Sequence, residues 1–235
     1  MDIACHEYIL ILNWRPINVK VMQAKQFFSS ITDGWPFKNI LLPEIEPWTW
    51  LKLLPEALAR FFEHCPLESR IHSIVPPNFH IFGDVFIGEN VALPPFGYIQ
   101  GPTYIGDHCI LRPSVYVRGN AIVGQHCVLG NSCEFKHSIL LDYVQVPHFN
   151  YVGDSILGTH VHLGAGAILS NVRFDKQEIL IKGDNNKIYA TGLKKMGAIM
   201  GDYAEAGCNA VLQPGTCLFP HCKVYPLNSV KGIIT

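Results

Sequence analysis

A six-residue period between residues 81 and 141 constrains the fold of this chain more than any other feature. Every sixth position is apolar: Ile81, Ile87, Leu93, Ile99, Ile105, Leu111, Val117, Val123, Leu129, Phe135 and Leu141. The residue four positions after each of these is mostly small or β-branched. Such a period matches neither an α-helix nor a long strand, but it is typical of a solenoid in which one short strand and one turn recur. We therefore expect an all-β solenoid with the apolar column inside.

Three six-residue units make one triangular coil in such a solenoid, so residues about 18 apart lie on the same face. The period slips by one residue after Leu141, since the next apolar positions are Val146, Val152 and Leu157. Irregular places in a repeat protein often carry function, so the slip predicts a site near residues 146–157.

The period also divides the chain. Residues 75–235 are expected to form the solenoid, interrupted by a long polar loop at 172–199. Residues 1–74 do not follow the period and are expected to form a small, mostly helical α/β cap over the open first coil.

Within this cap, Tyr8–Leu12 reads as a strand, and Ala24–Ile31 and Trp48–Phe62 read as helices. The second helix has an apolar face that includes Leu51 and Leu58, and Pro55 is expected to kink or divide it.

Charge and cysteine usage narrow the class of protein. Lys and Arg total 18 against 19 Asp and Glu, so neither nucleic acid nor an anionic membrane is an expected partner. No apolar run reaches transmembrane length, and no signal peptide is recognised. The eight cysteines include no CxxC pair, so we expect free thiols in a reduced, cytoplasmic protein. Charged residues make up only 16% of the chain, which favours an oligomer.

Three motifs flank the slip in the period. They are Glu134-Phe135-Lys136, the run HFNYVGD from His148 to Asp154, and the run LGAGA from Leu163 to Ala167 followed by Ser170-Asn171. Their spacing resembles the acetyltransferase half of the bifunctional N-acetylglucosamine-1-phosphate uridyltransferase family. The resemblance covers roughly residues 80–232. It implies a left-handed parallel β-helix of hexapeptide repeats, acetyl-CoA as co-substrate without a metal, and a homotrimer with its sites between neighbouring chains.

His148 matches the general base of that family, which takes a proton from the sugar amine as the amine attacks the acetyl thioester. Imidazole suits this task because its ordinary pKa near 6.5 leaves it largely neutral at cellular pH. The structural alternative is a histidine that merely occupies a corner of the coil.

Arg118 and Lys136 match the residues that bind the phosphate of the acceptor sugar. They stand 18 residues apart and should therefore lie on one face of successive coils. A guanidinium and an ammonium group both suit a phosphomonoester. The alternative is a pair of solvated surface charges. The resemblance further implies that Tyr151 contacts the sugar and that Asn171 lies near the acetyl group.

Two positions differ from the family pattern. His162 stands where the family has Asn, and Gln177 stands where it has Lys. Lys194 or Lys195 is expected to supply the missing charge, and the polar loop is expected to cover the pocket. The resemblance implies that acetyl-CoA lies along backbone groups of later coils, at Ala165, Cys208 and Pro226.

Two other functions remain open on the sequence. A metal enzyme of the γ-carbonic anhydrase type shares the solenoid and would use histidine ligands, for which the candidates are His126, His137, His148, His160 and His162. The other is a non-catalytic trimeric scaffold that has kept the coil without a working site.

Overall fold

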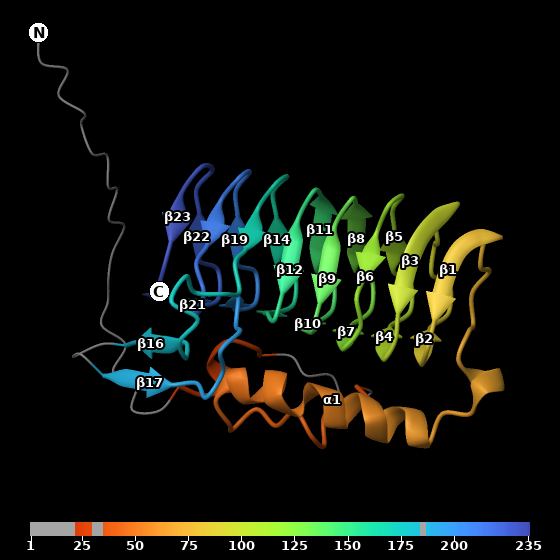
Figure 1. The fold of residues 1–235 in the computed structure, drawn as a ribbon, viewed down its shortest axis with the longest axis horizontal. Helices are drawn as coiled ribbons and strands as arrows, with labels where there is room; N and C mark the ends of the chain where they lie inside the picture. The colour runs from red at the N-terminus through yellow and green to blue at the C-terminus, as the bar shows by residue number, and fades with distance from the viewer. Residues whose placement is uncertain (1–21, 30–34, 184–186) are drawn as a thin grey trace, which may run out of the picture.

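The computed structural model describes residues 22–29, 35–183 and 187–235. The strand expected at Tyr8–Leu12 lies outside these residues. Most of the described chain is a solenoid whose short parallel strands form three sheets along one axis (Figure 1). The predicted left-handed parallel β-helix is confirmed. In the part of the chain that is described, no helix has the length and apolar character needed to cross a membrane.

Each sheet receives strands from successive coils, and each strand pairs in parallel with its counterpart one coil away. Sheet A contains β2 (Val85–Ile87), β4 (Thr103–Ile105), β7 (Ala121–Val123), β10 (Ser138–Leu140), β13 (Ile156–Leu157), β18 (Ala198–Met200), β21 (Thr216–Leu218) and β24 (Ile233–Ile234). Sheet B contains β1 (Asn78–Phe82), β3 (Phe96–Gln100), β6 (Tyr116–Val117), β9 (Glu134–Lys136), β12 (Tyr151–Gly153), β15 (Ile168–Leu169), β20 (Val211–Leu212) and β23 (Ser229–Val230). Sheet C contains β5 (Ile110–Leu111), β8 (Val128–Asn131), β11 (Gln145–His148), β14 (His162–Leu163), β19 (Glu205–Ala206) and β22 (Lys223–Val224).

The apolar column fills the interior as predicted, with one exception. Phe135, Val146 and Val152 are fully buried in the solenoid core, but it is Leu140 that joins them there. Leu141 instead packs into a second apolar cluster outside the solenoid. The prediction for Leu141 was therefore wrong, and the first short step falls one repeat earlier, between Phe135 and Leu140.

Both short steps occur at the corner between sheets B and A. A regular coil turns this corner with Gly119 and Asn120, at φ angles of 89° and 48°. The two shortened coils use one residue in the left-handed region, His137 at 49° and Asp154 at 47°. One residue has been removed from each corner, which explains the slip in the period.

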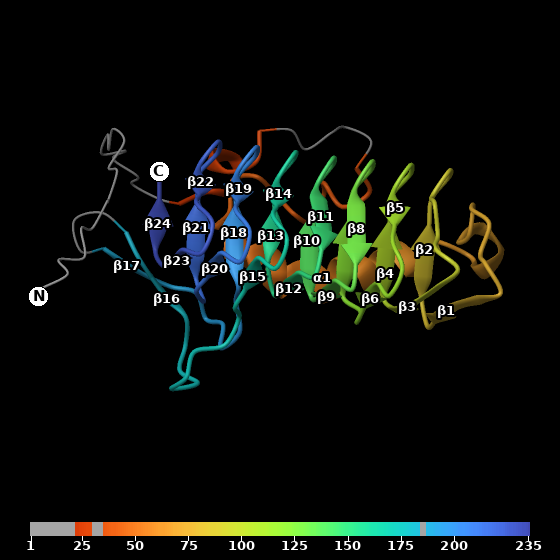
Figure 2. The same ribbon diagram turned by 90° about the horizontal axis from the view of Figure 1, so that it is seen from above.

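The described part of the N-terminal segment lies mainly along the flank of the solenoid (Figure 1). Helix α1 (Pro47–Glu63) presents Trp50, Leu54 and Leu58 to an apolar cluster that also contains outward-facing residues of sheet A. Ile122 and Ile156 are fully buried there. Figure 2 shows α1 running parallel to the axis behind the strands. Only the end of the segment pairs with the first coil, where Ile71 bridges to Ile87 of β2. The predicted cover over that coil and the domain boundary at residue 75 stay predictions.

Of the two effects expected of Pro55, a division of α1 does not occur, and a contact with the solenoid compensates for the hydrogen bond that proline cannot make. A proline at position 55 cannot donate to the carbonyl of Leu51, four residues earlier. The imidazole Nε2 of His137 lies 3.0 Å from that carbonyl oxygen and donates to it. The helix therefore continues from Pro47 to Glu63.

The other helix expected in this segment is much shorter than predicted. Residues Ala24–Gln26 form a single 3₁₀ turn, η1, and a second 3₁₀ turn, η2, spans Leu67–Ser69. Asp202 fixes the segment near η1, since its carboxylate accepts hydrogen bonds from the backbone nitrogen and hydroxyl of Ser29, each at 2.7 Å.

The polar loop leaves the coil after β15 and projects away from the solenoid (Figure 2). It then forms an antiparallel hairpin of β16 (Leu180–Lys182) and β17 (Ile188–Ala190). Tyr189 of this hairpin packs against Trp48 of α1, with 5.8 Å between ring centroids. The loop thus packs with the N-terminal segment and with outward-facing residues of sheet A in one apolar cluster.

Stacked rings line the corner between sheets A and C. Neighbouring centroids are 4.7–5.0 Å apart in the series His108, His126, Tyr143, His160, Tyr203 and His221. Each of these residues has a φ angle between 57° and 65°, and each turns the chain from sheet A to sheet C within its coil. The histidines at this corner therefore have a structural role.

Candidate active site

A buried carboxylate binds two of the predicted site residues, and one of these binds a third. Asp154 is only 6% exposed, and its Oδ2 accepts hydrogen bonds from Lys136 Nζ at 3.3 Å and from Asn171 Nδ2 at 2.5 Å. The same amide nitrogen donates to the hydroxyl oxygen of Tyr151 at 3.1 Å. We call these four residues the Asp154 cluster. Asp154 itself had no assigned role in the prediction from sequence.

The coil register explains how the cluster forms. Lys136 of β9 is paired with Gly153 of β12, one coil further along. A Cβ atom at Gly153 would lie 2.4 Å from the hydroxyl oxygen of Tyr151. Only glycine therefore leaves room for this phenol to fold back toward Asp154.

Tyr151 is held as a neutral hydrogen-bond donor. Burial and the nearby Asp154 carboxylate raise the pKa of the phenol above its ordinary value, so it keeps its proton at neutral pH. Because Asn171 donates to its oxygen, the hydroxyl hydrogen of Tyr151 remains available to a ligand.

Arg118 lies on the neighbouring coil, as its spacing from Lys136 predicted. Its backbone nitrogen donates to the carbonyl of Phe135 at 2.8 Å. Its guanidinium donates to the Glu134 carboxylate at 2.7 Å, and this bond raises the pKa of Arg118 above its ordinary value. The two side chains are 43% and 32% exposed, respectively. A phosphate bound at Arg118 would therefore compete with Glu134 for the guanidinium.

His148 ends β11 at the corner between sheets C and B, two residues before Asn150 and three before β12 begins. The imidazole is exposed, while the backbone beneath it is fixed by Asn150. The buried Asn150 side chain accepts from the His148 backbone nitrogen at 3.1 Å and donates to the carbonyls of Gly164 and Ala167 at 2.8 and 3.1 Å. Asn150 is a positioning residue that the sequence reasoning missed.

The three residues expected along acetyl-CoA continue the column of His148. The residue after each donates its backbone nitrogen to the previous coil: Gly166 to His148 at 3.0 Å, Asn209 to Ala165 at 2.9 Å, and Leu227 to Cys208 at 3.0 Å. Pro226 directly precedes Leu227 and completes the series. The structure therefore aligns His148, Ala165, Cys208 and Pro226 on successive coils along one edge.

The remaining predicted residues do not join the cluster. His162 lies exposed on sheet C, paired with Gln145 and Glu205. Lys194 and Lys195 are exposed, and neither ammonium group contacts an acidic partner among the described residues. The backbone of Lys195 forms a bridge with Val172, the residue after Asn171 of the cluster.

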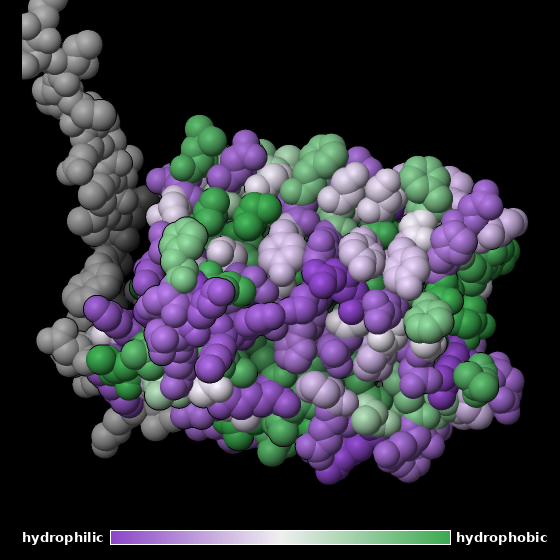
Figure 3. All heavy atoms as spheres, viewed as in Figure 1, coloured by the Kyte–Doolittle hydropathy of each residue, from purple (hydrophilic) through white to green (hydrophobic). Residues whose placement is uncertain are grey.

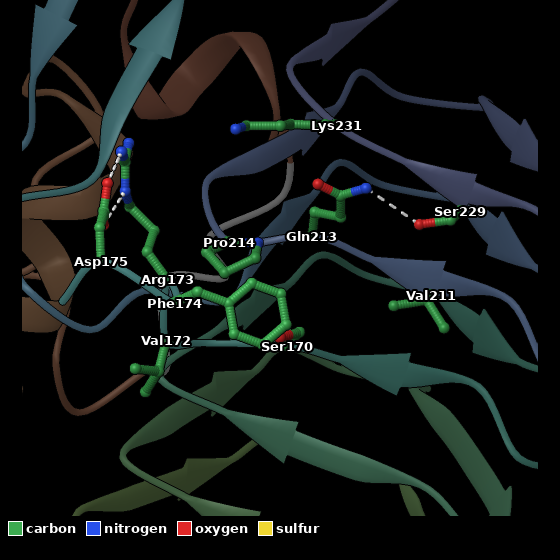
Figure 4. Close-up of a pocket in the computed structure, with 10 residues that line it drawn as sticks. All are labelled: Ser170, Val172, Arg173, Phe174, Asp175, Val211, Gln213, Pro214, Ser229 and Lys231. Carbon is green, nitrogen blue, oxygen red and sulfur yellow. Dashed lines mark hydrogen bonds and ion pairs between the residues drawn. The ribbon is translucent and has the colours of Figure 1, made fainter. Parts of the chain in front are cut away.

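A pocket of about 530 Å³ adjoins the cluster on sheet B, and we call it the sheet B pocket. Its floor is Ser170, Val211, Gln213 and Ser229, its wall is residues 172–175 of the polar loop, and Pro214 and Lys231 complete it (Figure 4). The loop thus forms one wall beside Asn171, in part as expected. Figure 3, which views sheet B from outside, shows hydrophilic residues across the middle of this face with hydrophobic ones interspersed.

The candidate metal ligands are dispersed over the solenoid. His126 and His160 lie in the stacked rings, His137 binds α1, and His148 lies at another corner. Within the described ranges, no three His, Cys, Asp or Glu side chains are grouped as a metal ion would require.

The Asp154 cluster should also contribute to stability, which an isosteric change can test. Asp154→Asn removes the charge that Lys136 and Asn171 share, and we expect the free energy of unfolding to fall by about 2 kcal/mol, as for other hydrogen bonds to charged groups. Urea denaturation would measure it. Glu56→Gln, which breaks an exposed helix pair with Arg60, is the control and should change stability by less than about 1 kcal/mol. Equal stability of the two variants would contradict the role given to Asp154.

Comparison with known proteins is consistent with this geometry. Residues 99–230, more than half of the chain, match the family described as the GMPPB C-terminal domain. The chain belongs to this family. The matched region begins in β3 and extends to β23, so it includes the Asp154 cluster and His148.

Other similar proteins have names that describe bifunctional enzymes. A Sulfurisphaera tokodaii protein named bifunctional sugar-1-phosphate nucleotidylyltransferase/acetyltransferase is 34% identical over 97 residues, which is 41% of this chain and 24% of that protein. The bifunctional protein GlmU of Methanococcus maripaludis strain C7 is 37% identical over 86 residues, 37% of this chain and 20% of the relative. That of Methanocaldococcus jannaschii is 34% identical over 95 residues, 40% and 23% of the two chains. The match thus spans a quarter or less of each relative, and the predicted family resemblance is confirmed.

Proposed function

We propose that this protein is an acetyl-CoA-dependent N-acetyltransferase acting on an amino-sugar phosphate, with glucosamine 1-phosphate as the first acceptor to test. One observation carries the proposal: an exposed imidazole stands three residues before β12, and the Asp154 cluster, which includes the Lys136 ammonium group, lies at the far end of this strand. A candidate base and a candidate phosphate-binding group thus flank one short strand.

The reaction needs one proton acceptor and one anion-binding site. The amine of the acceptor attacks the thioester carbonyl carbon while neutral His148 takes a proton from the nitrogen. The resulting tetrahedral intermediate collapses with cleavage of the carbon–sulfur bond. The imidazolium then returns the proton to the departing CoA thiolate, so the products are the N-acetylated sugar phosphate and CoA.

The other residues would bind and orient the two substrates. Lys136 and Arg118 would hold the phosphate of the acceptor. Tyr151 would donate a hydrogen bond to the sugar, and Asn171 would lie near the acetyl group. The column of Ala165, Cys208 and Pro226 would hold acetyl-CoA by its backbone groups. His162, Lys194 and Lys195 would contact the acceptor only if the loop or a second chain moves them closer.

We further propose a homotrimer in the cytoplasm. His148 and Arg118 are exposed on one chain, so a second chain against sheet B would enclose the site and exclude water. The described cysteines are free thiols, which suits a reducing compartment. Light scattering on the purified protein tests the trimer; a monomer at all concentrations would contradict it.

A direct assay tests the function. We expect the wild-type protein to release CoA from acetyl-CoA in the presence of glucosamine 1-phosphate and to form the N-acetylated product. Glucosamine without phosphate should react far more slowly, because Lys136 and Arg118 would have no anion to bind. No transfer to any amino-sugar phosphate would contradict the proposal and leave the scaffold as the better interpretation.

A further inference from the structure

The sheet B pocket combines features that suit a nucleotide. Its volume of about 530 Å³ lies within the usual range for small-molecule sites. Val172, Val211 and Pro214 provide aliphatic surface, and Ser170, Gln213 and Ser229 provide polar atoms. The ring of Phe174 lies at its centre in Figure 4 and is fully exposed to solvent, so a flat ligand could cover it. Aromatic side chains commonly bind nucleobases by stacking.

The pocket also carries one uncompensated positive charge. Arg173 and Asp175 form a two-bond ion pair and neutralise each other. Lys231 extends over the pocket in Figure 4, and its ammonium group has no acidic partner among the described residues. Gln213 is oriented by a hydrogen bond of 3.1 Å to the Ser229 hydroxyl. The pocket therefore favours an anionic group beside a flat ring.

The position of the pocket indicates which substrate would fill it. Lys136 and Lys231 share one column of sheet B, separated by the strands β12, β15 and β20. Four strand spacings of about 4.8 Å put them roughly 19 Å apart. A small sugar phosphate held at Lys136 therefore cannot fill the pocket as well. Acyl-CoA can fill it while its thioester lies near the acceptor, because a long flexible arm separates the thioester from the nucleotide.

The strands that form the floor also follow the column expected along acetyl-CoA. Ala165, Cys208 and Pro226 stand three residues before Ile168, Val211 and Ser229, which belong to β15, β20 and β23. A co-substrate that begins at His148 and follows this edge therefore comes to lie beside the pocket.

We propose that the sheet B pocket binds the nucleotide end of acyl-CoA, with Lys231 contacting its phosphates and Phe174 stacking on its adenine ring. This inference rests on the proposed acetyltransferase function. It assigns binding roles to two residues, in the polar loop and in the last coil, that the sequence did not single out.

Comparison of two acetyl donors tests the pocket. Acetyl-pantetheine has the thioester and the arm but lacks the nucleotide. We expect Lys231→Gln to raise the KM for acetyl-CoA about tenfold, the effect of one charge-assisted hydrogen bond, and to leave kcat and the KM for acetyl-pantetheine unchanged. Phe174→Ala should raise the KM for acetyl-CoA about fivefold with the same selectivity. Lys223→Gln is the matched control, since Lys223 is exposed at the same end of the solenoid but lies on sheet C and pairs with Glu205.

A binding measurement separates failure of this inference from failure of the function. Calorimetry with adenosine 3′,5′-bisphosphate, the nucleotide end alone, should give binding to the wild type that is about tenfold weaker in Lys231→Gln and unchanged in Lys223→Gln. An active enzyme whose KM for acetyl-CoA does not respond to either pocket variant would overturn the inference but retain the function. Nucleotide binding that depends on Lys231, in a protein without acetyl transfer, would support the pocket and contradict the function. No binding of the bisphosphate by the wild type would also overturn the inference.

Discussion

Replacement of His148 by Ala is expected to lower kcat for acetyl transfer about 100- to 10,000-fold, the usual contribution of a positioned general base. The imidazole is exposed, and the backbone beneath it is fixed by Asn150 through bonds that do not involve the ring. The variant should therefore fold normally and bind both substrates. Release of CoA under saturating acetyl-CoA and glucosamine 1-phosphate measures the effect.

The matched control is His80→Ala, because His80 is also exposed but lies on β1 in the first coils. It should keep full activity. Added imidazole should restore part of the rate to His148→Ala and none to an Asn150 variant, whose corner would be displaced. Full activity of His148→Ala would show that another group takes the proton, and the catalytic assignment would fail.

The solenoid could be predicted from the sequence because the inward residue of each repeat has to be apolar, whatever lies outside. The same rule failed at Leu140 and Leu141, where adjacent apolar residues are both buried. Leu140 faces the solenoid core and Leu141 faces the N-terminal segment. A period alone cannot decide between neighbours when both sides of a strand are covered.

The location of the N-terminal segment could not be derived from its own residues. The available signal was in the solenoid, where Ile122, Ile139, Ile156 and Ile199 occupy outward positions of sheet A. Apolar residues on both faces of a strand indicate that both faces are buried. The stacked rings left a similar signal, since His108, His126, Tyr143 and His160 occupy one corner of successive coils.

The site was predictable only in part, and for a physical reason. Motif spacing brought Lys136, Tyr151 and Asn171 to one region, where Asp154 binds Lys136 and Asn171 and Asn171 binds Tyr151. The slip in the period also pointed to this region, since Asp154 occupies one shortened corner. Contacts of exposed side chains such as Lys194 depend on the loop path, which no repeat determines.

Trp50→Ala is expected to lower the free energy of unfolding by about 3–5 kcal/mol, as for other large aromatic truncations in a core. Trp50 is fully buried, stacks on Phe28 at 5.1 Å and approaches Trp35 at 6.1 Å. Its indole nitrogen donates to the carbonyl of Leu42 at 2.9 Å, which the variant leaves without this donor. Guanidinium chloride denaturation, followed by tryptophan fluorescence and circular dichroism, measures this change in the free energy of unfolding. Phe82→Ala is the control and should change it much less, because the Phe82 ring on β1 is exposed.

Whether the two signals of the denaturation experiment change at the same denaturant concentration is also informative. Tryptophan fluorescence reports only on the N-terminal segment, since the solenoid contains no tryptophan, whereas circular dichroism reports mainly on the strands. Because Trp50 and Leu54 share one apolar cluster with Ile122 and Ile156 of sheet A, we expect both signals to change together at a lower denaturant concentration. A change in fluorescence at a much lower denaturant concentration than the loss of the strand signal would contradict this expectation. It would mean that residues 1–74 unfold as an independent domain. Their contact with sheet A would then add little to the stability of the solenoid.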